Sequence, residues 1–105
     1  MDLVQQIYVV TACWPRDELS GLTSQIRRAA VSVPSNIAEG RGRASKGEFL
    51  NHLGIAYGSL MEVETHLLIA QRLGYVCDES ANGLGQAAAE VGRLVNGLAH
   101  ALSKT

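Results

Sequence analysis

The chain has 105 residues, of which 47% are apolar and 18% charged, so it is long enough for one domain and apolar enough to bury a core. Nine basic and ten acidic residues give a net charge of −1 at pH 7, which excludes a strongly basic protein that wraps nucleic acid and leaves open a local basic patch. Only 5% of the residues are aromatic, so we expect a core of Leu, Ile, Val and Ala.

The first half of the chain carries two predicted helices. Apolar residues three and four positions apart predict a helix over residues 2–13, which the Trp-Pro pair at residues 14–15 ends because a residue before proline avoids helical backbone angles. The same period predicts a second helix over residues 20–40, with Asp17 or Ser20 as its cap and glycines at its end.

The second half is predicted to be helical as well. Ser45 and Glu48 form a capping-box pattern at the start of a long helix over residues 45–73. A fourth apolar repeat predicts a helix over residues 79–102. Four amphipathic helices with short connections predict an all-α, up-down-up-down antiparallel four-helix bundle, formed as a single domain over residues 1–105.

Several kinds of site are not expected. The chain starts without the basic and apolar stretches of a signal peptide, and no run reaches the roughly 18 apolar residues of a spanning helix, so we expect no membrane association. Cys13 and Cys77 lack metal-ligand spacing, so no metal and no cofactor are predicted, and two lone thiols fit a reducing cytoplasm. No catalytic residues are predicted and the chain is not expected to be an enzyme, because Glu62 and Glu64 stand two positions apart on a helix and do not face each other.

A second apolar face on the two central helices predicts that the chain assembles with copies of itself. Val31 and Ala38 point away from the core side of their helix, as do Ile55 and Ile69 of the following one. Such residues form either a subunit interface or ordinary exposed aliphatic surface, and we favour the interface.

Two further features of the central helices bear on this interface. Pro34 is expected to kink its helix and to shape the surface for a neighbour. Glycines inside the helices, among them Gly54 and Gly58, are expected to allow helices to approach closely, which would offset their cost of about 1 kcal/mol each. The residues assigned to the subunit interface are Val31, Pro34, Ala38, Ile55, Gly58, Glu62 and Ile69.

A basic segment lies in the middle of the chain. Residues 27–46 contain five basic side chains and one acid, a net charge of +4, whereas the rest of the chain carries −5. Arg41, Arg43 and Lys46 belong to the glycine-rich connection between the central helices, where they either contact phosphate groups or form an ordinary solvated turn.

Antiparallel pairing of the central helices gives a register. Residues whose numbers sum to about 88–90 should face each other, which sets Arg27 and Arg28 level with the Met-Glu pair at residues 61–62, and Asn36 level with His52. We expect an ion pair or polar contact there, within the chain or between subunits, with nucleic-acid contact by the two arginines as the alternative.

Two runs of this sequence resemble a known family. SQIRRAAVSVPSNIAEGRGR (24–43) and FLNHLGIAYGSLMEVETHLLIAQRLGY (49–75) are similar to four-helix bundle proteins encoded in intervening sequences of bacterial large-subunit ribosomal RNA genes. The resemblance implies a ring-like homopentamer, and kinship with accessory proteins of diversity-generating retroelements, which associate with a reverse transcriptase and nucleic acid. The positions that match the family pattern are Gln25, Arg27, Arg28, Asn36, Glu39, Gly40, Gly42, Arg43, Gly58, Ser59 and Glu62.

These expectations together favour a cytoplasmic, non-enzymatic, pentameric accessory protein associated with nucleic acid. Its partners would be copies of itself, RNA or DNA, and a reverse transcriptase. The candidate nucleic-acid-binding residues are Arg41, Arg43, Lys46, Arg27 and Arg28. The alternative is an assembly or scaffold module that binds a protein partner without contacting nucleic acid.

Overall fold

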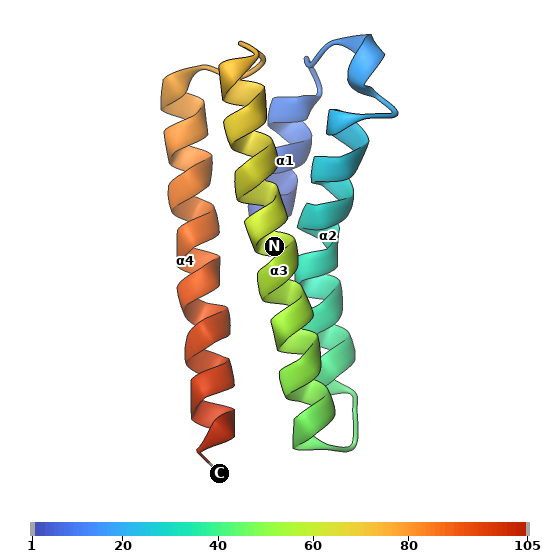
Figure 1. Ribbon diagram of the computed structural model, residues 1–105, viewed down its shortest axis with the longest axis vertical. Helices are drawn as coiled ribbons and strands as arrows, with labels where there is room; N and C mark the ends of the chain where they lie inside the picture. Colours follow the sequence, from blue (N-terminus) through green and yellow to red (C-terminus); the bar gives the residue numbers. More distant parts are fainter. Residues whose placement is uncertain (1, 105) are drawn as a thin grey trace.

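The structure, a computed structural model, describes residues 2–104 and consists of helices that run up and down one long axis (Figure 1). The elements are α1 (Asp2–Thr11), the 3₁₀ turn η1 (Arg16–Glu18), α2 (Leu22–Arg41), α3 (Lys46–Arg72) and α4 (Asp78–Ser103). Each α-helix begins and ends within two residues of its predicted range. The predicted all-α, up-down-up-down arrangement of four helices is confirmed.

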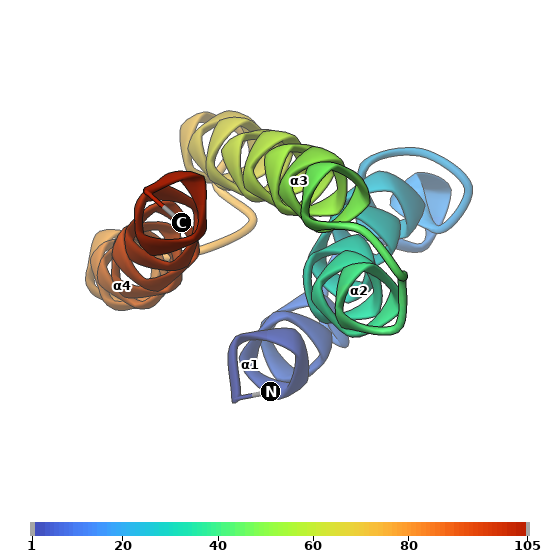
Figure 2. The same cartoon turned by 90° about the horizontal axis from the view of Figure 1, so that it is seen from below.

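The helices follow one another around an arc. Helix α2 packs along α3, α3 packs along α4, and α1 contacts α2 more closely than it contacts α4 (Figure 2). Helix α1 has 10 residues and α4 has 26, lengths of about 15 and 39 Å at 1.5 Å per residue. One end of the molecule is therefore built from all four helices, whereas the other end is built from α2, α3 and α4.

The helix ends follow local hydrogen bonding. Ser45 caps α3 as predicted: its Oγ accepts from the Glu48 amide at 3.1 Å and lies 3.3 Å from the Glu48 carboxylate. Gly21, rather than Asp17 or Ser20, occupies the N-cap position of α2. The first amide of the helix, that of Leu22, donates instead to Glu18 Oε1 at 3.3 Å. Gly74 follows α3 with a φ of +80°, a backbone conformation that glycine adopts without strain.

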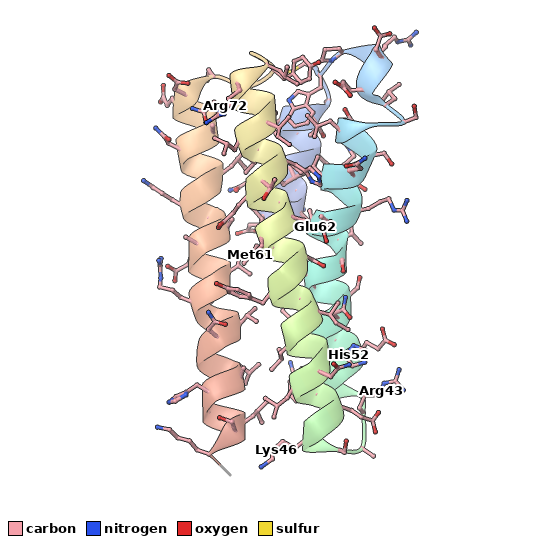
Figure 3. All side chains as sticks on the ribbon, in the orientation of Figure 1. Arg43, Lys46, His52, Met61, Glu62 and Arg72 are labelled. Carbon is pink, nitrogen blue, oxygen red and sulfur yellow. The ribbon has the colours of Figure 1, made fainter. Side chains whose placement is uncertain are left out.

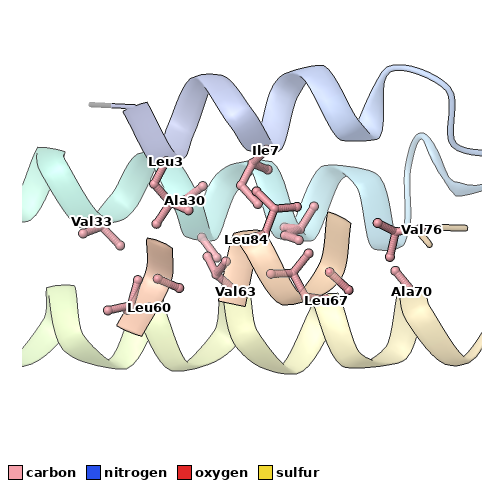
Figure 4. Close-up of a cluster of buried hydrophobic side chains, with 14 of the residues drawn as sticks. Leu3, Ile7, Ala30, Val33, Leu60, Val63, Leu67, Ala70, Val76 and Leu84 are labelled. Atoms are coloured by element: carbon pink, nitrogen blue, oxygen red, sulfur yellow. The ribbon is translucent and has the colours of Figure 1, made fainter. Parts of the chain in front are cut away.

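The core is aliphatic, as expected from the composition. Its largest fully buried apolar side chains come from α1, α2 and α3, and α4 adds Leu84, Ala88 and Val95. Figure 4 shows Leu84 among the buried side chains of the other helices. Trp14 and Val76 close the core at the four-helix end, where the Trp14 ring lies 5.9 Å from that of Tyr75. Among the helices within residues 2–104, none combines the length and the apolarity that a membrane crossing requires.

The helical glycines meet the expectation of close helix approach only in part. A Cβ at Gly54 or Gly58 would meet no atom within 4 Å, so these glycines do not mediate close helix contacts within the chain. The close approaches occur at Gly92, where a Cβ would lie 3.2 Å from Leu60 Cδ2, and at Gly40. Helix α2 continues through Pro34 without a break.

Candidate nucleic-acid and subunit interfaces

The basic turn, Arg41, Arg43 and Lys46, joins α2 to α3 at the three-helix end of the molecule. Arg41 is the last residue of α2, and Lys46 is the first residue of α3. All three side chains are exposed, and Figure 3 shows Arg43 and Lys46 projecting from this end. The turn thus brings together three of the five predicted nucleic-acid-binding residues.

Carboxylates partly neutralise one member of the basic turn. Arg43 Nη2 lies 2.8 Å from Glu39 Oε1, and Nη1 lies 3.9 Å from Glu48 Oε2. Both acids and Arg43 are about half exposed, so each pair is worth little in water and exchanges readily for a stronger anion. Arg41 and Lys46 have no ion-pair partner within residues 2–104, which leaves their charges available to a ligand.

Lys104 is a further cation at the same end, which the sequence analysis missed. It is the exposed C-cap residue of α4, and the up-down topology returns this terminus to the level of the basic turn (Figure 1). The predicted helix order already implied this position. In an up-down bundle, the turn after the second helix and the end of the fourth helix lie at the same end.

Arg27 has a different role from the one expected. Its Nε donates to Thr11 Oγ1 at 2.8 Å, and its guanidinium carbon lies 4.7 Å from the centroid of the Tyr8 ring. The predicted placement of Arg27 beside residues 61–62 is therefore wrong, because this side chain faces α1 and not α3. Arg27 is only partly exposed and lies far along α2 from the basic turn.

Arg28 and Glu62 lie level with each other, as the register predicts. With Gln25 they line a polar pocket of about 360 Å³ on the outer seam between α2 and α3. No ion pair joins Arg28 to Glu62 within the described chain, so the expected intrachain salt bridge is absent. At the base of the pocket, Ser59 Oγ donates to Ser32 Oγ at 2.8 Å. The predicted contact between Asn36 and His52 is confirmed.

The residues assigned to a subunit interface occupy two separate surfaces. Val31, Pro34 and Ala38 follow Arg27 at steps of 4, 3 and 4, so they continue the side of α2 that α1 covers only near the four-helix end. Ile55, Gly58, Glu62 and Ile69 share the outward side of α3. Ile55 is 45% exposed, Ile69 42% and Val31 40%, so each surface carries large apolar side chains in contact with water.

The titratable groups with shifted pKa values lie at the opposite end from the basic turn. The pKa of Tyr75 is raised, chiefly by its hydrogen bond to the Glu18 carboxylate, and the pKa of the Cys77 thiol is lowered, chiefly by its hydrogen bond with the Ser80 hydroxyl. Cys13 and Cys77 are both free and exposed. Between Asp2 and Lys104, no three His, Cys, Asp or Glu side chains lie close enough together to hold a metal ion.

Comparison with known proteins shows a matching family and a solved structure of similar fold. The family model described as "23S rRNA-intervening sequence protein" matches residues 1–97. The crystal structure of a protein of unknown function from the S23 ribosomal protein family of Bacteroides thetaiotaomicron VPI-5482 is similar, with a TM-score of 0.83 and 23% sequence identity. The match covers 93% of this chain and 92% of that one, and at this identity it shows the fold alone. None of the curated proteins matches.

Proposed function

Because the chain belongs to the 23S rRNA-intervening sequence protein family, we propose that it is a non-enzymatic, homo-oligomeric accessory protein that binds structured RNA through the turn between α2 and α3. In this proposal the subunits form a pentameric ring in the cytoplasm, and the ring acts beside a nucleic-acid-processing partner such as a reverse transcriptase. Binding, rather than chemistry on a substrate, is the contribution of this chain.

The observation that carries the proposal is the separation of charge along the molecule. The chain as a whole has a net charge of −1, yet Arg41, Arg43 and Lys46 stand together at one end, with Lys104 at the same level. Phosphate contacts by Lys and Arg supply most of the affinity for nucleic acid and do not require reading of base edges. The absence of aromatic residues from 41–46 fits backbone contact better than base stacking.

The two apolar surfaces support a ring. A closed ring is built from a head-to-tail contact, which needs two different patches on each subunit. The exposed residues on the α1-facing side of α2 and those on the outward side of α3 are two such patches, each with large aliphatic side chains. A ring would also repeat the basic turn around one rim, which multiplies weak phosphate contacts into a stronger one.

A charge-reversal experiment tests the nucleic-acid part of the proposal. The variant Arg41→Glu, Arg43→Glu, Lys46→Glu should lose binding to a fluorescein-labelled hairpin RNA, measured by anisotropy across a series of salt concentrations. The matched control is Arg16→Glu, Arg72→Glu, Arg93→Glu, which changes the net charge equally at three other exposed positions. Equal binding of the RNA by the two triple variants would show that the basic turn is not the RNA-binding site.

A light-scattering measurement tests the assembly. We expect a mass of five subunits for the unmodified chain, and a smaller mass for Ile55→Glu, which places a charge on the outward side of α3. Gln5→Glu is the control, because Gln5 is exposed on α1 outside both surfaces. A single-subunit mass for the unmodified chain at micromolar concentration contradicts the ring.

The alternative is a scaffold that binds a protein partner and no nucleic acid. The observation in its favour is the engagement of Arg43 by Glu39 and Glu48, which reduces the positive charge of the turn. This alternative predicts no RNA binding even at low salt, whereas the leading proposal predicts binding that weakens steeply as salt rises.

A further inference from the structure

His52 of α3 lies against the last turn of α2, next to the basic turn (Figure 3). A Cβ at Gly40 would stand 2.8 Å from His52 Cβ, and Gly40 is the residue directly before Arg41. The Gly40 carbonyl also accepts from the Arg43 amide at 3.1 Å. The imidazole of His52 therefore stands at the base of the turn that carries the proposed RNA contact.

The two ring nitrogens of His52 have different surroundings. Nδ1 lies 3.1 Å from Asn36 Oδ1, and because Asn36 Nδ2 donates to Ser32, the hydrogen-bond network makes Nδ1 the donor. Nε2 has no hydrogen-bond partner within residues 2–104 and is not buried, so it reaches solvent. The neutral ring thus carries its proton on the inner nitrogen and presents a lone pair at the outer one.

Protonation of His52 adds a positive charge at the surface without breaking the bond to Asn36. An imidazole gains this charge between about pH 8 and pH 5, whereas Lys and Arg side chains stay charged throughout that range. The charged side chains at this end of the molecule are Glu39 and Arg41 of α2, Arg43 of the turn, Lys46 and Glu48 of α3, and His100 and Lys104 of α4.

The two carboxylates of this group do not occupy the imidazole. Glu39 and Glu48 both contact Arg43, and neither forms an ion pair with His52 within the part of the chain that the structure describes. The outer nitrogen of His52 is therefore open to an anion from solution.

We propose that His52 is a pH-dependent member of the RNA-binding surface, and that its Nε2 donates to a phosphate oxygen when the ring is protonated. This inference rests on the proposed RNA contact of the basic turn and adds the regulation of that contact. The bond from Nδ1 to Asn36 fixes the ring, so a phosphate contact orders little that is not already ordered. RNA binding should strengthen as the pH falls, because the protonated ring offers a charged donor and the neutral ring presents only a lone pair.

His100 is the matched control for His52. It is exposed in the last turn of α4, at the same end of the molecule, and it offers the same change of charge. Helix α4 packs on α3 and makes no contact with α2, so His100 does not share the packing that holds His52 beside the basic turn.

The test measures binding of a fluorescein-labelled hairpin RNA with hydroxyl ends by anisotropy at pH 6, 7 and 8, where Glu side chains keep their charge. For the unmodified chain we expect affinity at least about threefold higher at pH 6 than at pH 8. His52→Asn keeps an N–H donor in the place of Nδ1 and cannot be protonated, so its affinity should not change over this range. His100→Asn should retain the pH dependence of the unmodified chain.

A second measurement uses the unmodified chain alone. The chemical shift of the His52 Cε1 proton, followed by NMR against pH, should show a transition that moves to higher pH when the RNA is bound. This shift follows from reciprocity, because a ligand that prefers the protonated ring must favour protonation. A purely structural role of His52 would leave the transition in place.

The outcomes separate this inference from the proposed function. Circular dichroism confirms that both variants are folded. RNA binding without pH dependence in the unmodified chain, or with equal pH dependence in His52→Asn and His100→Asn, overturns the role of His52 and leaves the basic turn as the RNA contact. Absence of RNA binding at every pH overturns the proposed function, and this inference with it.

Discussion

His52 Nδ1 lies 3.1 Å from Asn36 Oδ1 and so joins α3 to α2 between residues sixteen positions apart. Asn36 Nδ2 donates to the carbonyl and the hydroxyl of Ser32, each at 2.9 Å, so Oδ1 is the free acceptor and the hydrogen-bond network assigns the shared proton to His52 Nδ1. The side chain of Asn36 therefore uses both of its polar ends to fix the level at which the two helices meet.

Asn36→Ala should destabilise the fold, because it leaves His52 Nδ1 without its acceptor and removes one of the two donors to the Ser32 hydroxyl, the other being Ser59 Oγ. The expected loss in the free energy of unfolding is about 1–2 kcal/mol in urea denaturation. Asn51→Ala is the control, since Asn51 is exposed on α3, and its effect should stay within about 0.5 kcal/mol. Equal losses would show that the Asn36 contacts add nothing beyond helix propensity.

Gly40→Ala should also destabilise, for a steric reason. A Cβ at residue 40 would lie 2.8 Å from His52 Cβ and 2.9 Å from Phe49 Cδ1, so the two helices would have to separate, at a cost of about 1–3 kcal/mol. Gly54→Ala makes the same change where no atom lies within 4 Å, and there it should raise stability by about 0.5–1 kcal/mol through helix propensity. Thermal unfolding of the two variants should shift in opposite directions, and a shared sign would contradict the close packing at Gly40.

The Tyr75 hydroxyl ties the end of α3 to η1 by donating to Glu18 Oε2 at 2.9 Å. This hydrogen bond raises the folded-state pKa of Tyr75 above its ordinary value of 10.0. The contribution to stability is therefore complete below pH 10 or so, and is lost as the pH rises through the folded-state pKa.

Tyr75→Phe should flatten the alkaline part of the stability profile. Urea midpoints measured between neutral pH and the alkaline limit should fall more steeply for the unmodified chain than for Tyr75→Phe. Tyr8→Phe is the control, since it removes a phenol from an exposed ring that makes no hydrogen bond within the described residues. The explanation fails if Tyr8→Phe flattens the profile as much as Tyr75→Phe does.

Glu39→Gln should strengthen RNA binding. The change releases Arg43 from its 2.8 Å contact and removes a negative charge beside the basic turn, so both the affinity and its dependence on salt should increase. Glu79→Gln alters the net charge equally at the start of α4, near the opposite end of the molecule, and should have a smaller effect. If the two substitutions change the anisotropy titration alike, then only net charge matters.

The sequence predicted those parts of the fold that depend on helical period and on chain order. The levels of Asn36 and His52, and of Arg28 and Glu62, follow from counting residues away from the turn, because antiparallel helices rise equally per residue. The side to which a residue points was harder to predict. Arg27 was assigned to α3 although it faces α1, because the rotation of α2 depends on where the other helices pack.

The candidate sites were predictable to different degrees. The cationic residues of the turn were evident from charge and glycine content, but the contacts of Arg43 with Glu39 and Glu48 depend on rotamers that no spacing rule supplies. An apolar groove of about 460 Å³ beside α4, lined by Leu3, Ile37 and Leu94, depends on the unequal lengths of α1 and α4 and on the axial position of α1. The spacing of apolar residues shows which side of each helix is buried, but not where one helix lies along the axis of another, so it did not predict the groove.

The uneven layering of the molecule has a thermodynamic consequence for ligands. The basic turn stands where three helices interlock instead of four, and local fluctuation is greatest where packed neighbours are fewest. A polyanion that immobilises this end must overcome the conformational entropy that the turn retains when it is free. A substitution that stiffens the turn without removing its charges would lower this entropic cost and should raise the affinity for the polyanion.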